Sequence, residues 1–291
     1  MAETVSTVEA AVDRAIARVG KKLVLMAPLG LGKPVQLVNA FYHRAAADPS
    51  LTLHIYTALC LEKPPLGTGV EAKLSGPIME RLFGDYEELA FIKPVRSDTL
   101  PANIQVSELY FKAGAMKNVP SAQRNYISSN YTHIARDMFD AGANVLVQLV
   151  AARETPDGLS VSLSCNPDTA TELMEMYAGS GKTCITIGQV HSALPFMEHD
   201  AEIGVDAFDL LVRNSAYDKT LFAVPNTAVP CRSVSVPSGM RWPIPASCAS
   251  STTATTARLS PRSPTSRWRW PATTNRSTRG SMSPRKCLST A

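Results

Sequence analysis

The chain changes character near Asn226, and this change limits what can fold. Residues 1–225 carry 19 Lys and Arg against 25 Asp and Glu, arranged in the apolar runs and capped segments of a globular protein. Residues 226–291 carry ten Lys and Arg, no Asp or Glu, and all three tryptophans. The net charge of +4 therefore averages two unlike parts. We expect one folded domain over 1–225, which is long enough to bury a core, followed by a basic Arg/Ser/Pro/Thr-rich tail over 226–291.

Three interpretations of the tail follow from its composition. A segment so poor in apolar residues is typical of a disordered carboxy-terminal tail, and its positive charge alone could attract nucleic acid or an acidic membrane. The third interpretation is a shifted reading frame. When the third base of each codon is read with the first two bases of the next, codons 227–243 can encode a run containing Leu-Gln-Ile-Gly-Ile-Gly-(Ala/Ser)-Leu-Gly-Asp-Ala-Leu. A glycine-rich turn followed by an apolar helical pattern over so long a run favours the frameshift.

The pattern before the break predicts an α/β fold, with a mostly parallel sheet and helices on both faces. Ser6 and Glu9 form a capping box, after which apolar residues recur at three- and four-residue steps until Gly20. Helices are also expected from Pro34 through Phe41 and over 168–178. Apolar runs or alternations that suit strands occupy 23–26, 51–55, 145–150, 159–163 and 184–187.

The same region resembles the amino-terminal domain of the acetyl-CoA hydrolase/transferase family, a branch of the family I CoA-transferases. The most specific stretch reads Gly-Lys-Pro-Val-Gln-Leu-Val-Asn-Ala at 32–40. Further matching stretches lie at 48–59, 61–64, 106–111, 129–132, 188–190, 194–197 and 221–225. The run in the shifted frame resembles the glycine-rich segment of the same family. That segment lies farther downstream in the family, so we expect coding sequence to be missing here as well as shifted.

The resemblance implies an acyl-CoA hydrolase or CoA-transferase that acts on short carboxylates. The CoA thioester is the substrate, with no bound cofactor and no metal, and family members are expected to be homo-oligomers. A glutamate carboxylate attacks the thioester and releases CoA thiolate. In a transferase the thiolate returns to form glutamyl-CoA, whereas in a hydrolase water ends the cycle.

In the family the reactive glutamate lies beyond the glycine-rich segment. We therefore assign the role to no glutamate before the break, Glu62 and Glu108 included, and the catalytic residue of this chain is unknown. We expect this truncated polypeptide to be inactive alone. Loss of a two-domain interface would also leave an apolar face exposed.

Four residues are candidates for proximity to the CoA substrate. Gly30 and Gly32 fall in a strand-to-helix turn whose backbone N–H groups could hold an anion, although a tight turn that needs glycine explains them more simply. Lys33 lies in the most specific family-like stretch. Asn130, with His133, follows a polar segment and could line a cleft or stabilise its own loop.

Other motifs predict no site. Residues 179–183 resemble the end of a P-loop, but a helix is expected before them and a strand after them, the reverse of that motif. No Gly-x-Ser-x-Gly elbow occurs before the break. The spacing of His191 and His199 matches no familiar metal site, and we expect the histidines to be solvated surface residues.

A cytoplasmic protein without a membrane partner is expected. Cys60, Cys165 and Cys184 are isolated and odd in number, which suits a reducing compartment. The first twenty residues form no signal peptide, and no apolar run approaches the roughly 18–20 residues of a membrane span. The rival hypothesis is a non-enzymatic α/β protein whose basic tail binds nucleic acid, which the enzyme hypothesis does not expect. A weaker third hypothesis is a hydrolase formed by the amino-terminal domain alone.

Overall fold

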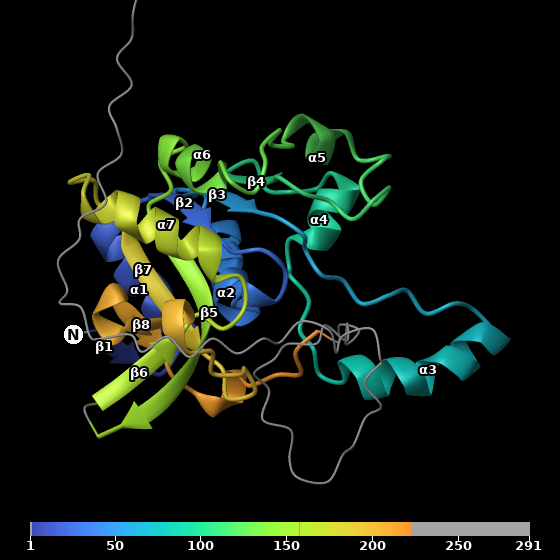
Figure 1. Ribbon diagram of the computed structural model, residues 1–291. Coiled ribbons are helices and arrows are strands. Elements are labelled where there is room, and N and C mark those ends of the chain that lie inside the picture. Colours follow the sequence, from blue (N-terminus) through green and yellow to red (C-terminus); the bar gives the residue numbers. More distant parts are fainter. Residues whose placement is uncertain (1, 157, 223–291) are drawn as a thin grey trace, which may run out of the picture. The chain divides into compact units, whose positions relative to one another are not determined.

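The computed structural model describes residues 2–156 and 158–222. The predicted disordered tail and the proposed frameshift therefore lie outside the described residues. Within the described part, strands and helices alternate along most of the chain, as Figure 1 shows. This alternation is the signature of parallel strands joined by helical crossovers.

A mostly parallel sheet forms the centre of the fold. Its main path runs in the order β1 (Glu3–Val5), β9 (Leu210–Val212), β7 (Ile185–Val190), β5 (Val145–Thr155), β2 (Lys22–Met26), β3 (Thr52–Thr57) and β4 (Ile104–Glu108). All neighbours on this path are parallel. The outer half of β5 turns back into the antiparallel strand β6 (Gly158–Ser162), which pairs with β8 (Glu202–Gly204).

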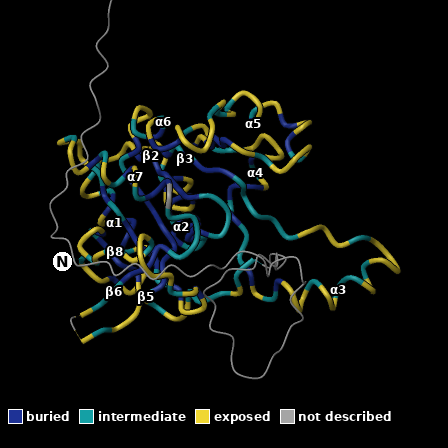
Figure 2. Tube along the Cα trace, viewed as in Figure 1, coloured by how far each residue is buried: buried dark blue, intermediate teal, exposed yellow. Residues whose placement is uncertain are grey.

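Helices cover both faces of the sheet, because alternate strand residues point to opposite sides. On one face, Leu23 and Leu25 of β2 belong to a core with α1 (Val8–Val19) and α2 (Val35–Ala47). On the other, Val24 and Met26 belong to a second core with α6 (Ile134–Asp140) and α7 (Pro167–Ala178). The buried positions follow the strands and the inner sides of these helices (Figure 2). The predicted α/β class is thus confirmed.

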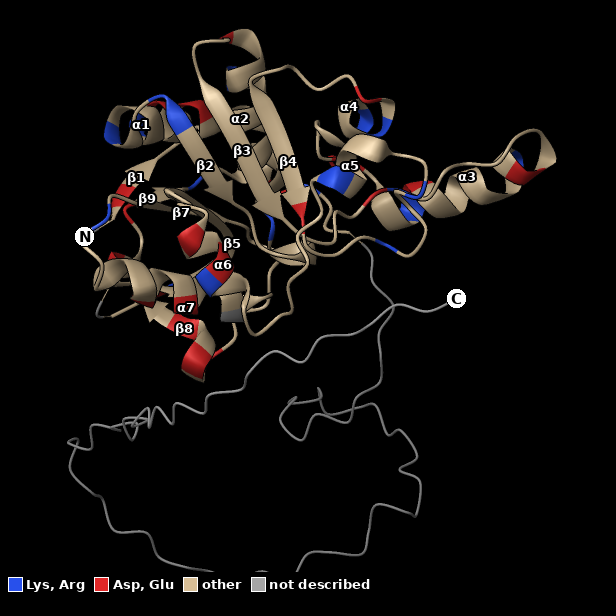
Figure 3. Cartoon of the chain, turned by 90° about the horizontal axis from the view of Figure 1, so that it is seen from above, with Lys and Arg blue, Asp and Glu red and all other residues tan. Residues whose placement is uncertain are grey.

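The remaining elements are shorter or lie outside these two layers. They are α3 (Val70–Phe83), α4 (Ile92–Ser97), α5 (Pro120–Arg124) and the 3-10 turns η1 (Gly30–Gly32), η2 (His199–Ala201), η3 (Val205–Ala207) and η4 (Ser215–Tyr217). Charged residues gather on helices and loops and are sparse on the strands, as Figure 3 shows. Among the described residues, no helix combines the length and apolarity needed to span a bilayer.

The predicted start of the first helix was wrong by one residue. Thr7 has an extended backbone, and its hydroxyl accepts a hydrogen bond from the Ala10 N–H at 3.2 Å, so Thr7 rather than Ser6 is the N-cap. The predicted box of Ser6 and Glu9 does not form, because Glu9 falls in the first turn beyond the cap. The rejection of a P-loop at 179–183 agrees with the structure, in which α7 precedes that segment and β7 follows it.

His54 departs from the expectation of a solvated histidine. It lies half-buried on β3, with its Nε2 2.9 Å from the Ser107 hydroxyl on β4 and its ring stacked on Tyr56 at 4.0 Å between centroids. Burial lowers the pKa of His54 from 6.5 to about 4. Between those two values the unfolded chain binds a proton that the folded protein does not. The contribution of His54 to stability therefore falls as the pH drops from about 6.5 to about 4.

We predict that His54→Gln reduces the acid sensitivity of the fold. Glutamine retains a hydrogen-bonding group for Ser107 but does not titrate. The loss in unfolding free energy between pH 7 and pH 4.5 should shrink by about 1–2 kcal/mol, a range that discounts the shift for partial exposure. Urea titrations at both pH values measure this difference. The exposed His43→Gln is the matched control, and an equal effect from it would contradict the assignment.

Candidate functional site

The candidate site lies where β2, β3 and β4 end. The three strands are parallel and in register, with Leu25 opposite Ile55 and Thr57 opposite Glu108, so their carboxyl ends meet at one edge of the sheet. In open α/β sheets this edge is where ligands bind. The η1 turn follows β2, the Ala58–Cys60 segment follows β3, and Glu108 is the last residue of β4.

Gly30 and Gly32 shape the turn after β2 for different reasons. Gly30 has φ of +51°, a left-handed conformation that favours glycine. Gly32 has no room for a side chain, since a Cβ there would lie 2.9 Å from the Cys165 carbonyl oxygen and 3.2 Å from Nε2 of Gln148. Backbone angle and close packing thus account for both glycines. A role in holding an anion stays a prediction.

Lys33 is buried at the same edge and ties two loops together. Its ammonium donates to the carbonyl oxygens of Ala58 and Leu59, the latter at 3.3 Å, so the turn after β2 is fastened to the segment after β3. Only 3% of the residue is exposed. Burial lowers the pKa of Lys33, while the nearby Cys60 and Glu108 oppose this shift.

Glu108, which is buried, and Cys60, which is half-buried, complete an ionisable cluster with Lys33. Burial raises the pKa of the Glu108 carboxyl, and a hydrogen bond with Cys60 and the charge of Lys33 work against that rise. Burial also raises the pKa of the Cys60 thiol well above its ordinary value. The thiol is therefore protonated at neutral pH and acts as a hydrogen-bond donor to Glu108, not as a nucleophile.

A cleft of about 560 Å³ opens beside this cluster, and we call it the basic cleft. Cys60 forms part of its wall together with Glu62, Lys63, Arg96 and Lys112. Arg96 holds Glu62 through two hydrogen bonds, 2.9 Å from Nε to Oε2 and 2.5 Å from Nη2 to Oε1, which neutralises both charges. The two lysines are left as the net charge of the lining, and this favours an anionic ligand.

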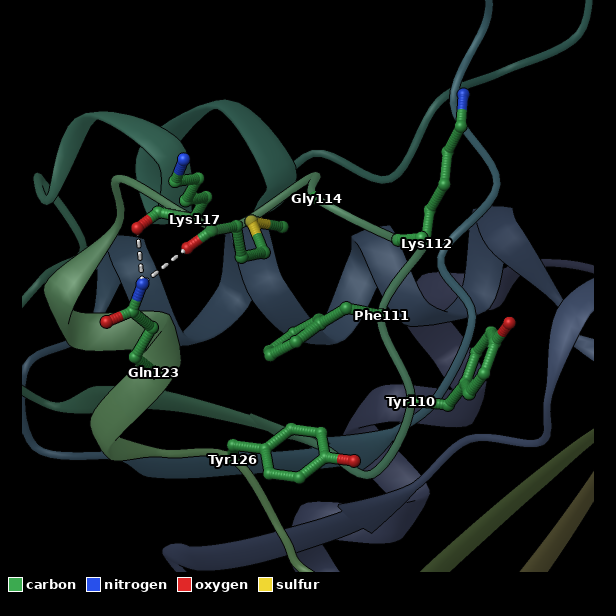
Figure 4. Close-up of a pocket in the computed structure, with 9 residues that line it drawn as sticks. Tyr110, Phe111, Lys112, Gly114, Lys117, Gln123 and Tyr126 are labelled. Atoms are coloured by element: carbon green, nitrogen blue, oxygen red, sulfur yellow. Dashed lines mark hydrogen bonds between the residues drawn. The ribbon is translucent and has the colours of Figure 1, made fainter.

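A second hollow of about 500 Å³, the aromatic pocket, shares part of its lining with the basic cleft. Lys112 and Gly114 line both hollows. Figure 4 shows the rings of Phe111 and Tyr126 facing one another, and their centroids are 5.3 Å apart. Gln123 closes one end by donating to the carbonyl oxygens of Met116 at 3.0 Å and Lys117 at 2.5 Å. Aromatic rings flanked by lysines suit a flat group that carries negative charge.

Asn130 is not part of either hollow. It is exposed in the loop between α5 and α6, where its side-chain oxygen accepts a hydrogen bond from the Thr132 hydroxyl at 2.7 Å and its carbonyl accepts one from the His133 N–H. The structure therefore brings Gly30, Gly32 and Lys33 together at the sheet edge and places Asn130 in a self-bonded loop. Whether any of the four contacts CoA stays a prediction.

Sequence reasoning missed Cys60, Arg96 and Lys112 and declined Glu108. The available signal was the position of Glu108, a carboxylate at the end of a family-like apolar stretch, because a charged residue that ends a buried strand rarely lacks a partner. Nothing in the local pattern indicated that Cys60 would meet it. That contact depends on the register between β3 and β4.

The expectation of surface histidines was also wrong for His191. This side chain is 3% exposed, with Nε2 2.9 Å from the Lys219 carbonyl oxygen and Nδ1 accepting from the Ala193 N–H at 3.2 Å. The segment around Lys219, later in the sequence, covers the His191 side chain. The polar residues next to His191 in the sequence did not indicate this. In the described part of the chain, no three His, Cys, Asp or Glu side chains group so as to hold a metal ion.

Comparison with solved structures identifies a similar fold. RipA from Yersinia pestis matches with a TM-score of 0.51 and 16% identity over 78% of this chain and 45% of RipA. A RipA variant matches with a TM-score of 0.51 and 17% identity over 78% of this chain and 44% of its own. The chain spans less than half the length of RipA. At this identity the likeness shows the fold alone.

Other comparisons add no identification. A 4-hydroxybutyrate CoA-transferase from Porphyromonas gingivalis matches with a TM-score of only 0.39 and 15% identity, over 72% of this chain and 38% of that one, and carries no argument. The sequence matches no model of a known protein family and no curated protein. The α/β fold of this chain is similar to that of RipA, whereas the CoA-transferase family and the activity stay predictions.

We predict that Lys33 and Glu108 are energetically coupled. Lys33→Met leaves two carbonyls without their donor and Glu108 without a nearby positive charge, and should cost about 1–3 kcal/mol. Adding Glu108→Gln should cost less than the sum of the single changes, by about 1 kcal/mol. Urea unfolding of the four proteins measures this coupling. Lys63→Met combined with Glu108→Gln is the control and should be additive. Additivity of the Lys33 pair as well would show that the cluster is not a unit.

Proposed function

We propose that this chain is the amino-terminal part of an acyl-CoA hydrolase or CoA-transferase that acts on short carboxylates. The observation that carries the proposal is where the family-like stretches fall in space. Residues 32–40 form the turn after β2 and the start of α2, and residues 48–59 form β3 and the segment that Lys33 holds. The first of these stretches thus meets the end of the second at the carboxyl edge of the sheet, where Lys33 donates to the Ala58 and Leu59 carbonyls.

The reaction proposed for the complete enzyme proceeds through a glutamate. The carboxylate attacks the thioester carbonyl, which breaks the carbon–sulfur bond and gives an acyl-glutamyl anhydride and CoA thiolate. The thiolate then attacks the glutamyl carbonyl, releasing the carboxylate product and leaving glutamyl-CoA. An acceptor carboxylate or water resolves this thioester. In the proposal this glutamate is encoded beyond the break, so none of Glu62, Glu108 or the other glutamates of residues 1–225 is assigned the role.

The described residues would then bind and orient the substrate. Lys63 and Lys112 give the basic cleft a net positive charge that suits the phosphates of CoA or the carboxylate of a short acid. The ion pair of Arg96 with Glu62 fixes the wall between them, and Arg96 also donates to the Ala115 carbonyl at 2.9 Å. Lys33 is fully engaged with backbone carbonyls, and its role is to position the loop that carries Cys60.

The proposal includes the basic segment 226–291, which lies outside the described residues. Its composition and the glycine-rich run readable in the shifted frame support an out-of-frame translation. We therefore propose that this 291-residue chain does not turn over acyl-CoA. A cytoplasmic enzyme encoded by the same gene with an intact reading frame does.

We predict that sequencing across the codons for 217–291 and beyond yields a continuous frame. That frame should encode Gly-Ile-Gly-(Ala/Ser)-Leu-Gly-Asp-Ala and a downstream domain with a glutamate. The protein expressed from it should release thiol from acetyl-CoA, while the printed chain should release none above background. Borohydride, which reduces an enzyme-bound glutamyl thioester, should inactivate the restored protein only after incubation with acetyl-CoA.

Two outcomes would overturn the proposal. One is a confirmed printed sequence whose chain binds DNA or RNA with a steep salt dependence that disappears when residues 226–291 are deleted, as the rival hypothesis requires. The other is thiol release by the printed chain itself, which would place the catalytic group in residues 1–225.

A further inference from the structure

The aromatic pocket presents tyrosine rings to solvent. Tyr110 and Tyr126 line it with exposed fractions of 52 and 45%, which are high for large side chains of a folded domain. Phe111 is half-buried between them in the lining, and the buried Met116 joins this lining to the hydrophobic core. Figure 4 shows Phe111 and Tyr126 at the centre of the pocket and Tyr110 to one side. Rings left uncovered in this way suit a ligand with a flat face.

The pocket is held in shape by hydrogen bonds to its loop. The Tyr110 carbonyl accepts from the Leu59 N–H at 2.9 Å, which ties the start of the loop to the segment that follows β3. Arg96 donates to the Ala115 carbonyl at 2.9 Å, and the Gln123 amide holds the two carbonyls that follow. A ligand therefore finds the rings already in place, and this lowers the entropic cost of binding.

Two unpaired lysines supply the charge of the pocket. Lys112 and Lys117 are exposed in its lining, and among the described residues neither ammonium forms an ion pair. Lys112 extends away from the rings in Figure 4 and also lines the basic cleft. An anionic group attached to a ring bound in the pocket would meet Lys112 where the two hollows share their lining. Lysine binds phosphate as a point charge and so suits this position.

The two hollows together favour a nucleotide. A simple aromatic acid carries its charge on the ring and would occupy only the aromatic pocket, of about 500 Å³, leaving the adjoining 560 Å³ of the basic cleft empty. A nucleotide places phosphates several bonds away from a flat base, and so reaches from one hollow into the other. The Gln123 amide nitrogen is already engaged by two carbonyls, so the base is recognised by stacking more than by its edge.

We propose that the aromatic pocket binds the base of a purine nucleotide whose phosphates contact Lys112. Purines are favoured over pyrimidines because their larger faces cover more of the exposed rings. CoA carries an adenine nucleotide at one end, and free nucleotides such as ADP carry the same chemistry. The inference therefore goes beyond the proposed function and does not depend on it. With CoA as the ligand, its arm would run from Lys112 along the basic cleft towards Cys60.

The test is a calorimetric titration of the full chain with ADP, acetyl-CoA and acetyl-pantetheine, which has the thioester arm without the nucleotide. ADP should bind saturably, and Tyr126→Ala should weaken it by about fivefold or more, as expected for loss of a stacking ring. Tyr126→Phe keeps the ring and should stay within about twofold of the parent. Lys112→Gln should weaken ADP but leave adenosine unchanged. Acetyl-pantetheine should be insensitive to Tyr126→Ala.

The comparison of ligands identifies the source of the nucleotide. Acetyl-CoA that binds more tightly than ADP, and loses the same factor in Tyr126→Ala, makes CoA the ligand. Equal affinities make it a free nucleotide, and either result supports the pocket. The matched control is Tyr131→Ala, which removes an exposed tyrosine that lines neither hollow and should leave the ADP affinity unchanged. Circular dichroism checks that each variant is folded.

Three results would overturn the inference. The first is no saturable binding of ADP or acetyl-CoA. The second is nucleotide binding that Tyr126→Ala leaves unchanged; if acetyl-CoA binding then still responds to Lys63→Gln, the inference fails while the proposed function stands. The third is a short single-stranded oligonucleotide that binds more than about tenfold tighter than ADP and depends on Tyr126, since the ligand is then a nucleic acid.

Discussion

The parallel register of β2, β3 and β4 is the constraint on which the candidate site depends. It brings the carboxyl-terminal ends of the three strands to one edge of the sheet. Lys33, Cys60 and Glu108 meet there, although Cys60 lies 27 positions after Lys33 and Glu108 lies 48 positions after Cys60. The Lys33 ammonium then fastens the segment after β3 to the turn after β2. Because Gly32 lies too close to Cys165 and Gln148 to accept a side chain, that turn has little freedom to move away. The segment after β3, which lines the basic cleft, is therefore held in place by Lys33.

Burying Lys33 and Glu108, with Cys60 half-buried beside them, has a cost that hydrogen bonding only partly offsets. Burial shifts the pKa of Lys33 downward and those of Glu108 and Cys60 upward, and the charges of Lys33 and Glu108 oppose each other's shift. Lys63 and Lys112 line the basic cleft instead, and the Lys63 ammonium also donates to the Gly84 carbonyl oxygen at 3.4 Å. Cys60 belongs to both groups, since it contacts the Lys33–Glu108 cluster and also lines the cleft.

The fold could be predicted where the spacing of apolar residues indicated a helix or strand and a proline or glycine marked its end. β2, α2, β5 and α7 begin or end within a few residues of their expected positions, because proline or glycine marks their limits. The site could not be predicted, since the meeting of Cys60 with Glu108 follows from strand register, which no local pattern records. His191 was misjudged for a related reason: the carbonyl of Lys219, 28 residues later, covers it.

The most direct test of this account is a calorimetric titration of the full chain with acetyl-CoA at moderate and high salt. The account predicts saturable binding that weakens at least fivefold, or about 1 kcal/mol, in Lys63→Gln with Lys112→Gln, and that is unchanged in Lys93→Gln, an exposed lysine outside the cleft. If the affinity is the same in the Lys63→Gln, Lys112→Gln variant and binding is lost at high salt, the binding is due to the basic segment 226–291. That result, or no binding at all, would contradict the proposal that this domain binds acyl-CoA at the basic cleft.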